Sequence, residues 1–119
     1  MNELHLGVVE SRFADIIWSH APLASNQLAK LAEEALGWKK STTYTVLKRL
    51  CDRGMFQNVK GTVSALLSRE EFYALQSEQV VEASFDGSLP AFVAAFSTRK
   101  KLSDAEIDQL QAIIDGMRG

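Results

Sequence analysis

Residues 37–54 read GWKKSTTYTVLKRLCDRG, and this stretch decides the fold. It has helical spacing between two glycines, with a narrow apolar stripe at Val46, Leu47 and Leu50. In its first half, hydroxyl and basic side chains occupy positions where an ordinary helix has alanine, leucine or glutamate. Serine and threonine carry a small helix-propensity penalty, so their concentration indicates a use other than helix formation. We therefore expect a helix over 40–53 whose outer face contacts a partner.

Positive charge is concentrated around the same stretch. The 119 residues carry a net charge of −2, and their composition is that of an ordinary globular protein, one domain or a small domain with an accessory arm. Residues 38–60 hold six Lys or Arg against one Asp, which gives +5, whereas residues 1–37 sum to −3 and residues 61–119 to −4. A basic island between acidic segments creates the local field that a phosphate backbone selects.

Two further helices are expected before residue 40. The first covers 7–20 and ends at Ala21-Pro22, because the residue before a proline disfavours the helical conformation. The second begins at Ser25, a favourable N-cap, and ends at Gly37, where a left-handed residue closes a helix. Three helices with two short connections match a helix-turn-helix and its supporting helix.

A β-hairpin is expected directly after the third helix. Residues 56–60 and 62–67 have strand-like composition on either side of Lys60-Gly61, a turn signal. A hairpin in this position is a wing. The expected fold class is therefore mainly α with a small β-hairpin wing, in which residues 1–67 form a winged helix-turn-helix domain.

Residues 68–119 predict a separate three-helix arm. Capping boxes begin helices at Ser68 and Ser103, and Ser88 caps a shorter helix between them, after a break at Asp86-Gly87. These helices carry more apolar surface than so short a segment can bury, so they fold back on the first domain or pair with a second copy. We expect pairing, since homodimers are the commonest symmetric assembly. The expected dimer contacts are Phe72, Leu75, Val80, Phe92, Phe96, Leu110, Ile113 and Ile114.

The third helix has the chemistry of a DNA-recognition helix. In a major groove, hydroxyl groups exchange hydrogen bonds with base edges and threonine methyl groups touch thymine. Lysine and arginine contact phosphates, which supply affinity rather than sequence information. The residues expected at double-stranded DNA are Ser41, Thr42 and Thr45 at bases, Tyr44 at a base or phosphate, and Lys39, Lys40, Lys48, Arg49 and Lys60 at phosphates.

Other classes of function have less support in the sequence. It contains no glycine-rich phosphate loop, metal-ligand spacing or nucleophile elbow, so we expect no enzyme, metal or cofactor. A single cysteine, no long apolar run and no secretory signal predict a cytoplasmic protein without membrane contact. Two alternatives stay open: a ligand-responsive regulator with a small-molecule pocket at Phe85, Phe92 and Phe96, and an adaptor whose winged helix binds a protein.

Several short motifs occur in a characteristic order. They are IIW-S in the first helix, Trp38 followed by T-x-x-T-x-L-x-R-L, then S-R-E-E-F, F-D-G-S-L and L-S-D-A-E-I. With these motifs the chain resembles the penicillinase-repressor family (BlaI/MecI/CopY type) over nearly its whole length. The resemblance implies a homodimeric winged-helix repressor on a palindromic operator, with DNA contacts at Ser41, Thr42, Thr45 and Arg49.

The same resemblance implies a way of releasing the operator. In the antibiotic-resistance members of the family, a membrane receptor and protease system leads to cleavage of the arm before a phenylalanine. The corresponding bond is Ala95–Phe96, although the cleaved members have asparagine where this chain has alanine. The copper-responsive branch uses a C-terminal cysteine-rich motif, and since this chain has only Cys51, metal sensing by that route is not expected. The wing is shorter than the family's, and Lys39-Lys40 replaces a frequent Ser-Pro.

Overall fold

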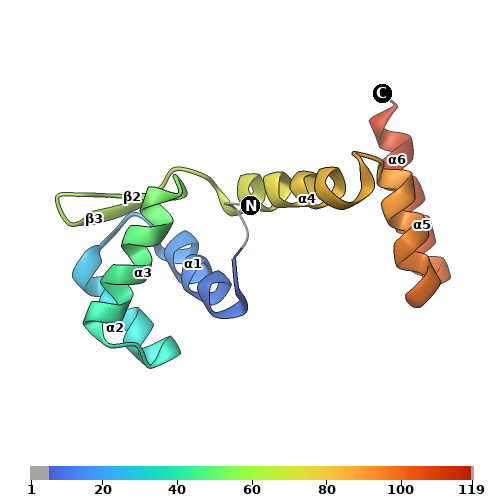
Figure 1. Cartoon of the computed structure of the whole chain (residues 1–119). Coiled ribbons are helices and arrows are strands. Elements are labelled where there is room, and N and C mark those ends of the chain that lie inside the picture. Colours follow the sequence, from blue (N-terminus) through green and yellow to red (C-terminus); the bar gives the residue numbers. More distant parts are fainter. Residues whose placement is uncertain (1–5, 119) are drawn as a thin grey trace. The chain divides into compact units, whose positions relative to one another are not determined.

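The computed structural model describes residues 6–118, which form six helices and a three-stranded sheet (Figure 1). This architecture confirms the predicted fold class, a winged helix with a helical C-terminal arm. The chain divides into two compact units, one ending at Gln79 and the other beginning at Val80. Each unit is therefore described by itself.

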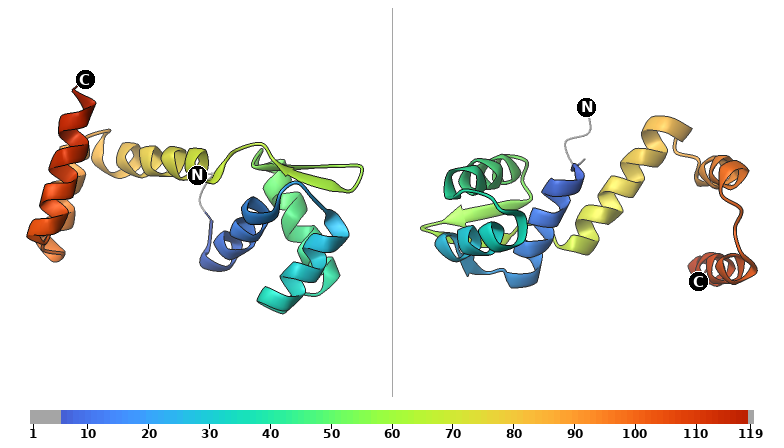
Figure 2. Two further views of the ribbon diagram at one scale, coloured as in Figure 1. Left: turned by 180° about the vertical axis from the view of Figure 1, so that it is seen from behind. Right: turned by 90° about the horizontal axis from the view of Figure 1, so that it is seen from below.

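Three helices of the first unit form the predicted helix-turn-helix with its supporting helix (Figure 2). At the end of the first helix, Ala21 is extended, with a ψ of 143°, and precedes Pro22 as expected. Gly37 has a φ of 70° and closes the second helix in the left-handed conformation. The second helix begins at Ser25, so Ala24 rather than Ser25 occupies its cap position. The bounds are α1 (Val8–His20), α2 (Ser25–Leu36) and α3 (Lys40–Asp52).

The wing is a hairpin of β2 (Phe56–Val59) and β3 (Thr62–Ala65), with the expected turn at Lys60-Gly61. Lys60 and Gly61 have φ values of 51° and 81°, and positive φ at both central residues is what a type I′ hairpin turn requires. A third strand, β1 (Leu23–Ala24), pairs with β3 in the order β1-β3-β2. The sequence did not predict β1, because two residues are too few to show a periodic pattern.

Trp18 joins three elements of the first unit around one core. Its ring centroid lies 5.4 Å from that of Phe56 in the wing and 5.5 Å from that of Phe72. Its indole Nε1 donates a hydrogen bond of 2.9 Å to the carbonyl of Leu67. The ring centroid of Trp38 lies 5.0 Å from that of Phe13. The largest fully buried apolar side chains are Phe13, Ile17, Leu28, Leu50, Met55, Phe56, Val63 and Phe72.

The first turns of α4 (Arg69–Phe85) also belong to this core. The predicted capping box begins the helix: the Ser68 N–H donates to Glu71 at 2.9 Å, and the Glu71 N–H donates to Ser68 Oγ at 3.0 Å. Phe72 was expected at the dimer contact, but it is 0% exposed and has no surface with which to touch a second copy. Phe72 thus belongs to the core of the first unit, which extends to Gln79 within α4.

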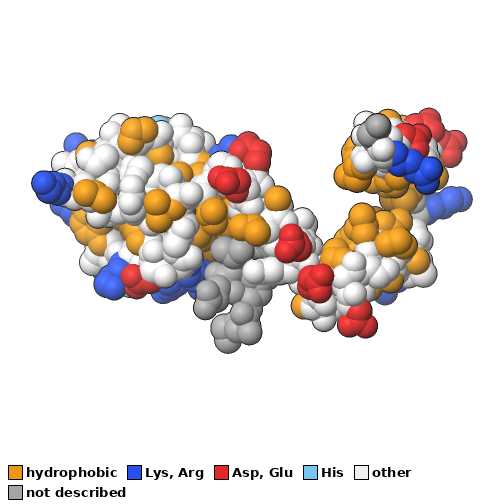
Figure 3. Space-filling model, turned by 90° about the horizontal axis from the view of Figure 1, so that it is seen from above, with side chains coloured by type: hydrophobic (Ala, Val, Ile, Leu, Met, Phe, Trp, Pro, Cys, Tyr) orange, Lys and Arg blue, Asp and Glu red, His pale blue; other side chains and the backbone are white. Residues whose placement is uncertain are grey.

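The second unit contains the end of α4, α5 (Leu89–Arg99) and α6 (Asp104–Met117). Ser88 Oγ accepts the Ala91 N–H at 3.1 Å, and the second capping box joins Ser103 and Glu106, so both predicted helix starts are confirmed. None of residues 80–118 is buried. Apolar side chains instead lie at the surface of this unit, which we call the arm (Figure 3). The arm as described has no core of its own.

Candidate nucleic-acid interface

Helix α3 presents its polar side chains as a strip opposite its buried face. Thr43, Val46, Leu47 and Leu50 are buried, whereas Ser41, Thr45 and Lys48 follow one another on the exposed side at helical spacing. The strip is widened on one edge by Thr42 and Arg49, which are exposed, and on the other by the half-buried Tyr44. These six side chains are all among the residues that the sequence predicted to contact DNA.

The hydroxyl groups of α3 have different roles. Thr43 is fully buried and its Oγ1 donates to the carbonyl of Lys39 at 3.3 Å, so this hydroxyl serves the fold. Thr45 Oγ1 donates to the carbonyl of Ser41 at 2.9 Å, yet Thr45 is exposed. A hydroxyl group has one proton and two lone pairs. Thr45 would therefore meet a base edge as an acceptor or through its methyl group.

Arg49 is held by a carboxylate of another helix. Its Nη1 lies 3.1 Å from Oε2 of Glu10, in the first turn of α1. Glu10 Oε1 also accepts the Gly7 N–H at 3.5 Å, so contacts at both oxygens fix this carboxylate. An arginine has five N–H donors, and the Glu10 contact leaves donors for a phosphate. Sequence reasoning missed Glu10, because 39 positions separate it from Arg49.

The other basic residues of the set lie around α3 and the wing. Lys48 forms an exposed ion pair with Asp52 at 3.1 Å, and an exposed pair of this kind contributes little stability. Lys40 Nζ lies 5.7 Å from the ring centroid of Tyr44. Lys39 precedes α3 and Lys60 is in the wing turn, both exposed. All nine residues predicted to contact DNA thus belong to the first unit.

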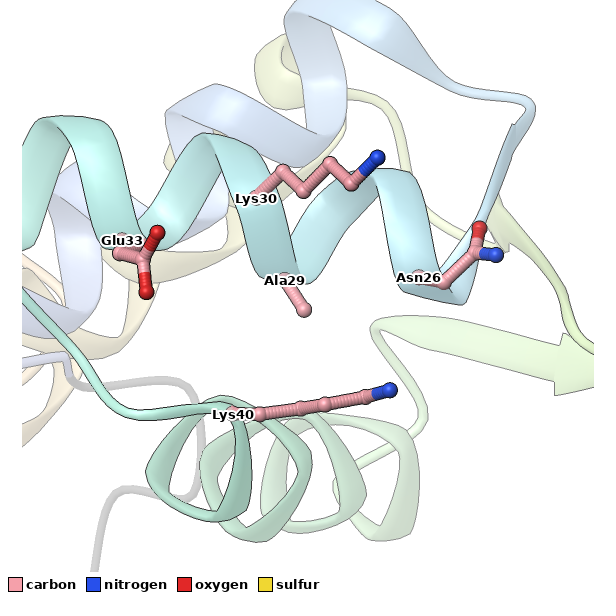
Figure 4. A pocket seen from close by; sticks show the side chains of 5 residues that line it. All are labelled: Asn26, Ala29, Lys30, Glu33 and Lys40. Carbon is pink, nitrogen blue, oxygen red and sulfur yellow. The ribbon is translucent and has the colours of Figure 1, made fainter.

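Hollows lined by described residues lie on both sides of α3. The first, of about 280 Å³, lies between α2 and α3 and is lined by Asn26, Ala29, Lys30, Glu33 and Lys40 (Figure 4). The second, of about 420 Å³, lies between α3 and the wing and is lined by Tyr44, Leu47, Lys48, Cys51, Asp52 and Asn58. Sequence reasoning did not single out Asn26, Lys30 or Asn58, because an isolated polar residue on a helix or strand carries no periodic signal.

Cys51 in the second hollow has a raised pKa. Burial is the main cause and the charge of Asp52 adds to it, while Lys48 acts in the opposite direction. A thiol with a raised pKa is protonated at neutral pH and is a weak nucleophile. This agrees with a packing role for Cys51 rather than a redox role.

The arm carries most of the residues predicted at the dimer contact. Apart from the buried Phe72, the set is exposed or, for Phe92, half-buried, and Leu75 alone of the remaining seven belongs to the first unit. A hollow of about 180 Å³, with a wholly apolar lining, is formed by Phe92, Val93, Phe96, Leu102 and Leu110. The sequence also shows further apolar side chains of the arm at helical spacing that were not among the expected dimer contacts, and these are exposed too, namely Leu89, Val93, Ile107 and Met117.

The Ala95–Phe96 bond lies inside α5. Thr98 Oγ1 donates to the Ala95 carbonyl at 2.7 Å, and the Lys100 N–H donates to the Phe96 carbonyl at 3.0 Å. Both carbonyl groups flanking this position are therefore engaged within the last turns of the helix. A protease that needs an extended chain would have to unwind this end of α5 before cutting it.

Two other features concern the whole described chain. Within residues 6–118, His, Cys, Asp and Glu side chains form no group of three or more that could hold a metal ion. In the same residues, no helix has the length and apolarity needed to cross a membrane.

Comparison with known proteins agrees with this geometry. The family model described as penicillinase repressor matches residues 6–116, which include both units. A penicillinase repressor from Bacillus licheniformis is 25% identical over 104 residues, which cover 84% of this chain and 81% of that protein. The family model therefore spans α3, the wing and nearly all of the arm.

Proposed function

Because this chain belongs to the penicillinase repressor family, it is a DNA-binding transcriptional repressor, and we propose that it acts as a homodimer on a palindromic operator. Members of the family are DNA-binding regulators and not enzymes. The proposal places the protein in the cytoplasm, where it reaches DNA.

The exposed strip of α3 is the observation that carries the proposal. Ser41, Thr42 and Thr45 are accessible on a helix whose opposite face is buried, and lysines and Arg49 border them. A helix of this kind enters a major groove, where its hydroxyl groups contact base edges and its lysine and arginine side chains contact phosphates. The Glu10 contact supports a fixed direction for Arg49, which favours a defined register on the duplex.

The arm supports the homodimer. None of its residues 80–118 is buried, and it exposes Phe96, Leu110, Ile113 and Ile114, so it gains stability when those side chains are removed from water. Pairing of two identical arms gives a two-fold axis, and a two-fold dimer reads two half-sites related by the same symmetry. The half-sites would be centred one or two helical turns apart.

Release of the operator follows from the same arrangement. Each winged helix alone neutralises few phosphates, and affinity that depends on few phosphates is low at physiological salt. A signal that weakens or cuts the arm would therefore free the DNA. An inducing protease or receptor system is the proposed source of that signal, with Ala95–Phe96 as the position corresponding to the family's cleaved bond.

A small-molecule inducer is a second candidate, favoured by the apolar hollow at Phe92 and Phe96. Its volume of about 180 Å³ lies below the ~300–1,000 Å³ of ordinary ligand pockets. This small volume favours apolar side chains of a second copy over a small-molecule ligand in the hollow. A ligand-dependent rise in the melting temperature would support the inducer instead. An adaptor that binds a protein through its winged helix would show weak, sequence-blind DNA binding with a steep salt dependence.

Selection of bound fragments from random duplex DNA at ~150 mM salt tests the proposal, since non-specific binding is already much reduced there. Enrichment of a palindrome supports a dimeric, sequence-specific repressor, and the spacing of its half-sites reports the arm geometry. A folded, dimeric protein that enriches no sequence would contradict the proposal and favour a protein partner or a required ligand.

A further inference from the structure

We propose that the hollow between α2 and α3 binds a backbone phosphate of DNA, held by Lys30 from α2 and Lys40 from α3. This inference rests on the proposed DNA binding and adds residues of α2 to the interface. Lys40 was predicted from the sequence, whereas Lys30 and Asn26 lie outside the stretch with the basic surplus.

The polar groups of the hollow are arranged with their donors at one end. Lys30 and Lys40 extend from two different helices toward the end at which Asn26 lies, and the Glu33 carboxylate lies at the opposite end (Figure 4). Ala29, which is 7% exposed, lines the hollow between them, and its small side chain leaves the space open. Two ammonium groups and an amide at one end of a hollow of about 280 Å³ suit a compact anion with several acceptor oxygens.

No ion pair joins Lys30 or Lys40 to a carboxylate of residues 6–118. Ion pairs of the first unit join Lys48 to Asp52, Arg49 to Glu10 and Arg69 to Asp15. The described partner of Lys40 is the ring of Tyr44, which does not cancel its charge. Two like charges that line one hollow favour an anion beside them.

The hollow continues into surface that was already assigned to DNA. The Ser25 N–H, next to Asn26, donates to the Gly61 carbonyl at 2.8 Å, so the wing turn with Lys60 lies beside the start of α2. Along α3, Lys40, Tyr44 and Lys48 follow at four-residue spacing on one flank and lead to the second hollow. This series of donors fits an extended polyanion better than one isolated small anion.

The lining also argues against a nucleotide. None of the five residues that line the hollow is aromatic, and proteins commonly hold an unpaired base by stacking it on an aromatic side chain. A phosphodiester group of a duplex needs no such platform, because its bases stay stacked in the helix.

The salt dependence of DNA affinity tests the proposal. Lys30→Gln is compared with the wild-type chain and with Lys101→Gln, a matched change at an exposed position of the arm. Affinity for a random-sequence duplex and for any selected operator is measured from about 50 to 200 mM salt. We expect Lys30→Gln to lower the slope of log affinity against log salt by about 0.9 and to weaken binding roughly three- to tenfold, with Lys101→Gln like wild type.

The two duplexes separate this proposal from the proposed function. If Lys30→Gln leaves the salt slope unchanged in a protein that enriches a palindrome, the proposed phosphate site is wrong and the proposed repressor function stands. If the slope on random duplex falls but no palindrome is enriched, the phosphate site is supported and the proposed operator binding is not. Saturable binding of inorganic phosphate, followed by NMR at the Asn26 amide, together with an unchanged DNA slope, would assign the hollow to a free anion and overturn the proposal.

Discussion

The two units of this chain use similar side chains in opposite ways. In the first unit, Trp18, Phe56 and Phe72 pack together, and Phe56 and Phe72 lose nearly all contact with solvent. In the arm, Phe92 and Phe96 also approach one another, at 6.3 Å, yet Phe96 keeps 48% of its surface exposed. Apolar content alone therefore does not say where burial occurs. The first unit completes its core within one chain, and the arm needs a second surface to do the same.

Phenylalanine-to-alanine changes in the two units are the strongest test of this contrast. Phe72→Ala should lower the free energy of unfolding of the first unit by about 3–5 kcal/mol, because it opens a cavity in a closed core. Phe96→Ala, the matched change in the arm, should have a far smaller effect on the dilute monomer, since its ring is half exposed. Urea unfolding of both variants measures the difference. Equal losses would show that the arm has a core within the single chain.

A charged substitution on α6 tests whether the arm buries its exposed apolar side chains against a second copy of the chain. Ile113→Asp should raise the dimer dissociation constant at least about thirtyfold, the effect of losing ~2 kcal/mol at a well-packed contact. Ala112→Asp, on the opposite side of the same helix, is the control and should change little. Analytical ultracentrifugation gives both constants, and near-UV circular dichroism reports whether the first unit stays folded. Equal weakening by both variants would place the contact elsewhere.

Features that depend on neighbouring residues could be predicted from the sequence. The capping boxes at Ser68 and Ser103, the left-handed Gly37 and the wing turn are all confirmed, because each depends on a few consecutive side chains. The exposed strip of α3 was predictable for the same reason, since helical spacing separates it from the buried stripe.

Features that depend on distant residues could not be predicted. The burial of Phe72 requires Trp18, the direction of Arg49 requires Glu10, and the hollow at Lys30 requires Lys40 from the next helix. None of these pairs is marked by a pattern in the sequence. In the proposed homodimer, the residues that cover the arm would come from a second chain, so no pattern within one chain identifies the contact.

Within the first unit, two substitutions on α3 should separate affinity from specificity. Arg49→Ala should weaken binding to all duplexes about tenfold and lower the salt slope by about 0.9, because it removes a phosphate contact. Thr45→Ala should cost about 1–3 kcal/mol of discrimination at a single base position and leave the slope unchanged. Titration of both variants against operator and mutated duplexes measures these effects. If neither change affects DNA binding, α3 does not lie in the major groove. If either change alters the dimer dissociation constant, DNA binding and dimerisation are not divided between the two units.

The smallest expected effect concerns the start of α4, which lies in the first unit. The pKa of Glu71 lies below its ordinary value of 4.5, chiefly because its carboxylate accepts the backbone N–H of Ser68 and secondly because of the Ser68 side chain. The folded state thus favours the ionised form, so this stabilisation is present above about pH 4.5 and is lost as the pH falls through the folded pKa. Glu71→Gln keeps a side chain able to complete the capping box but removes the charge.

The stability difference between wild type and Glu71→Gln should therefore be constant near neutral pH and shrink in acid. Urea unfolding between about pH 3 and pH 6 measures it, and Glu70→Gln, in the same first turn, controls for loss of a nearby acid. The difference should be small, since Glu71 is exposed to solvent. A difference that does not vary with pH would mean that the charge of Glu71 does not stabilise the helix start. The start of α4 would then depend on the packing of Phe72 and on Arg69, whose Nε lies 3.1 Å from Asp15 Oδ1 of α1.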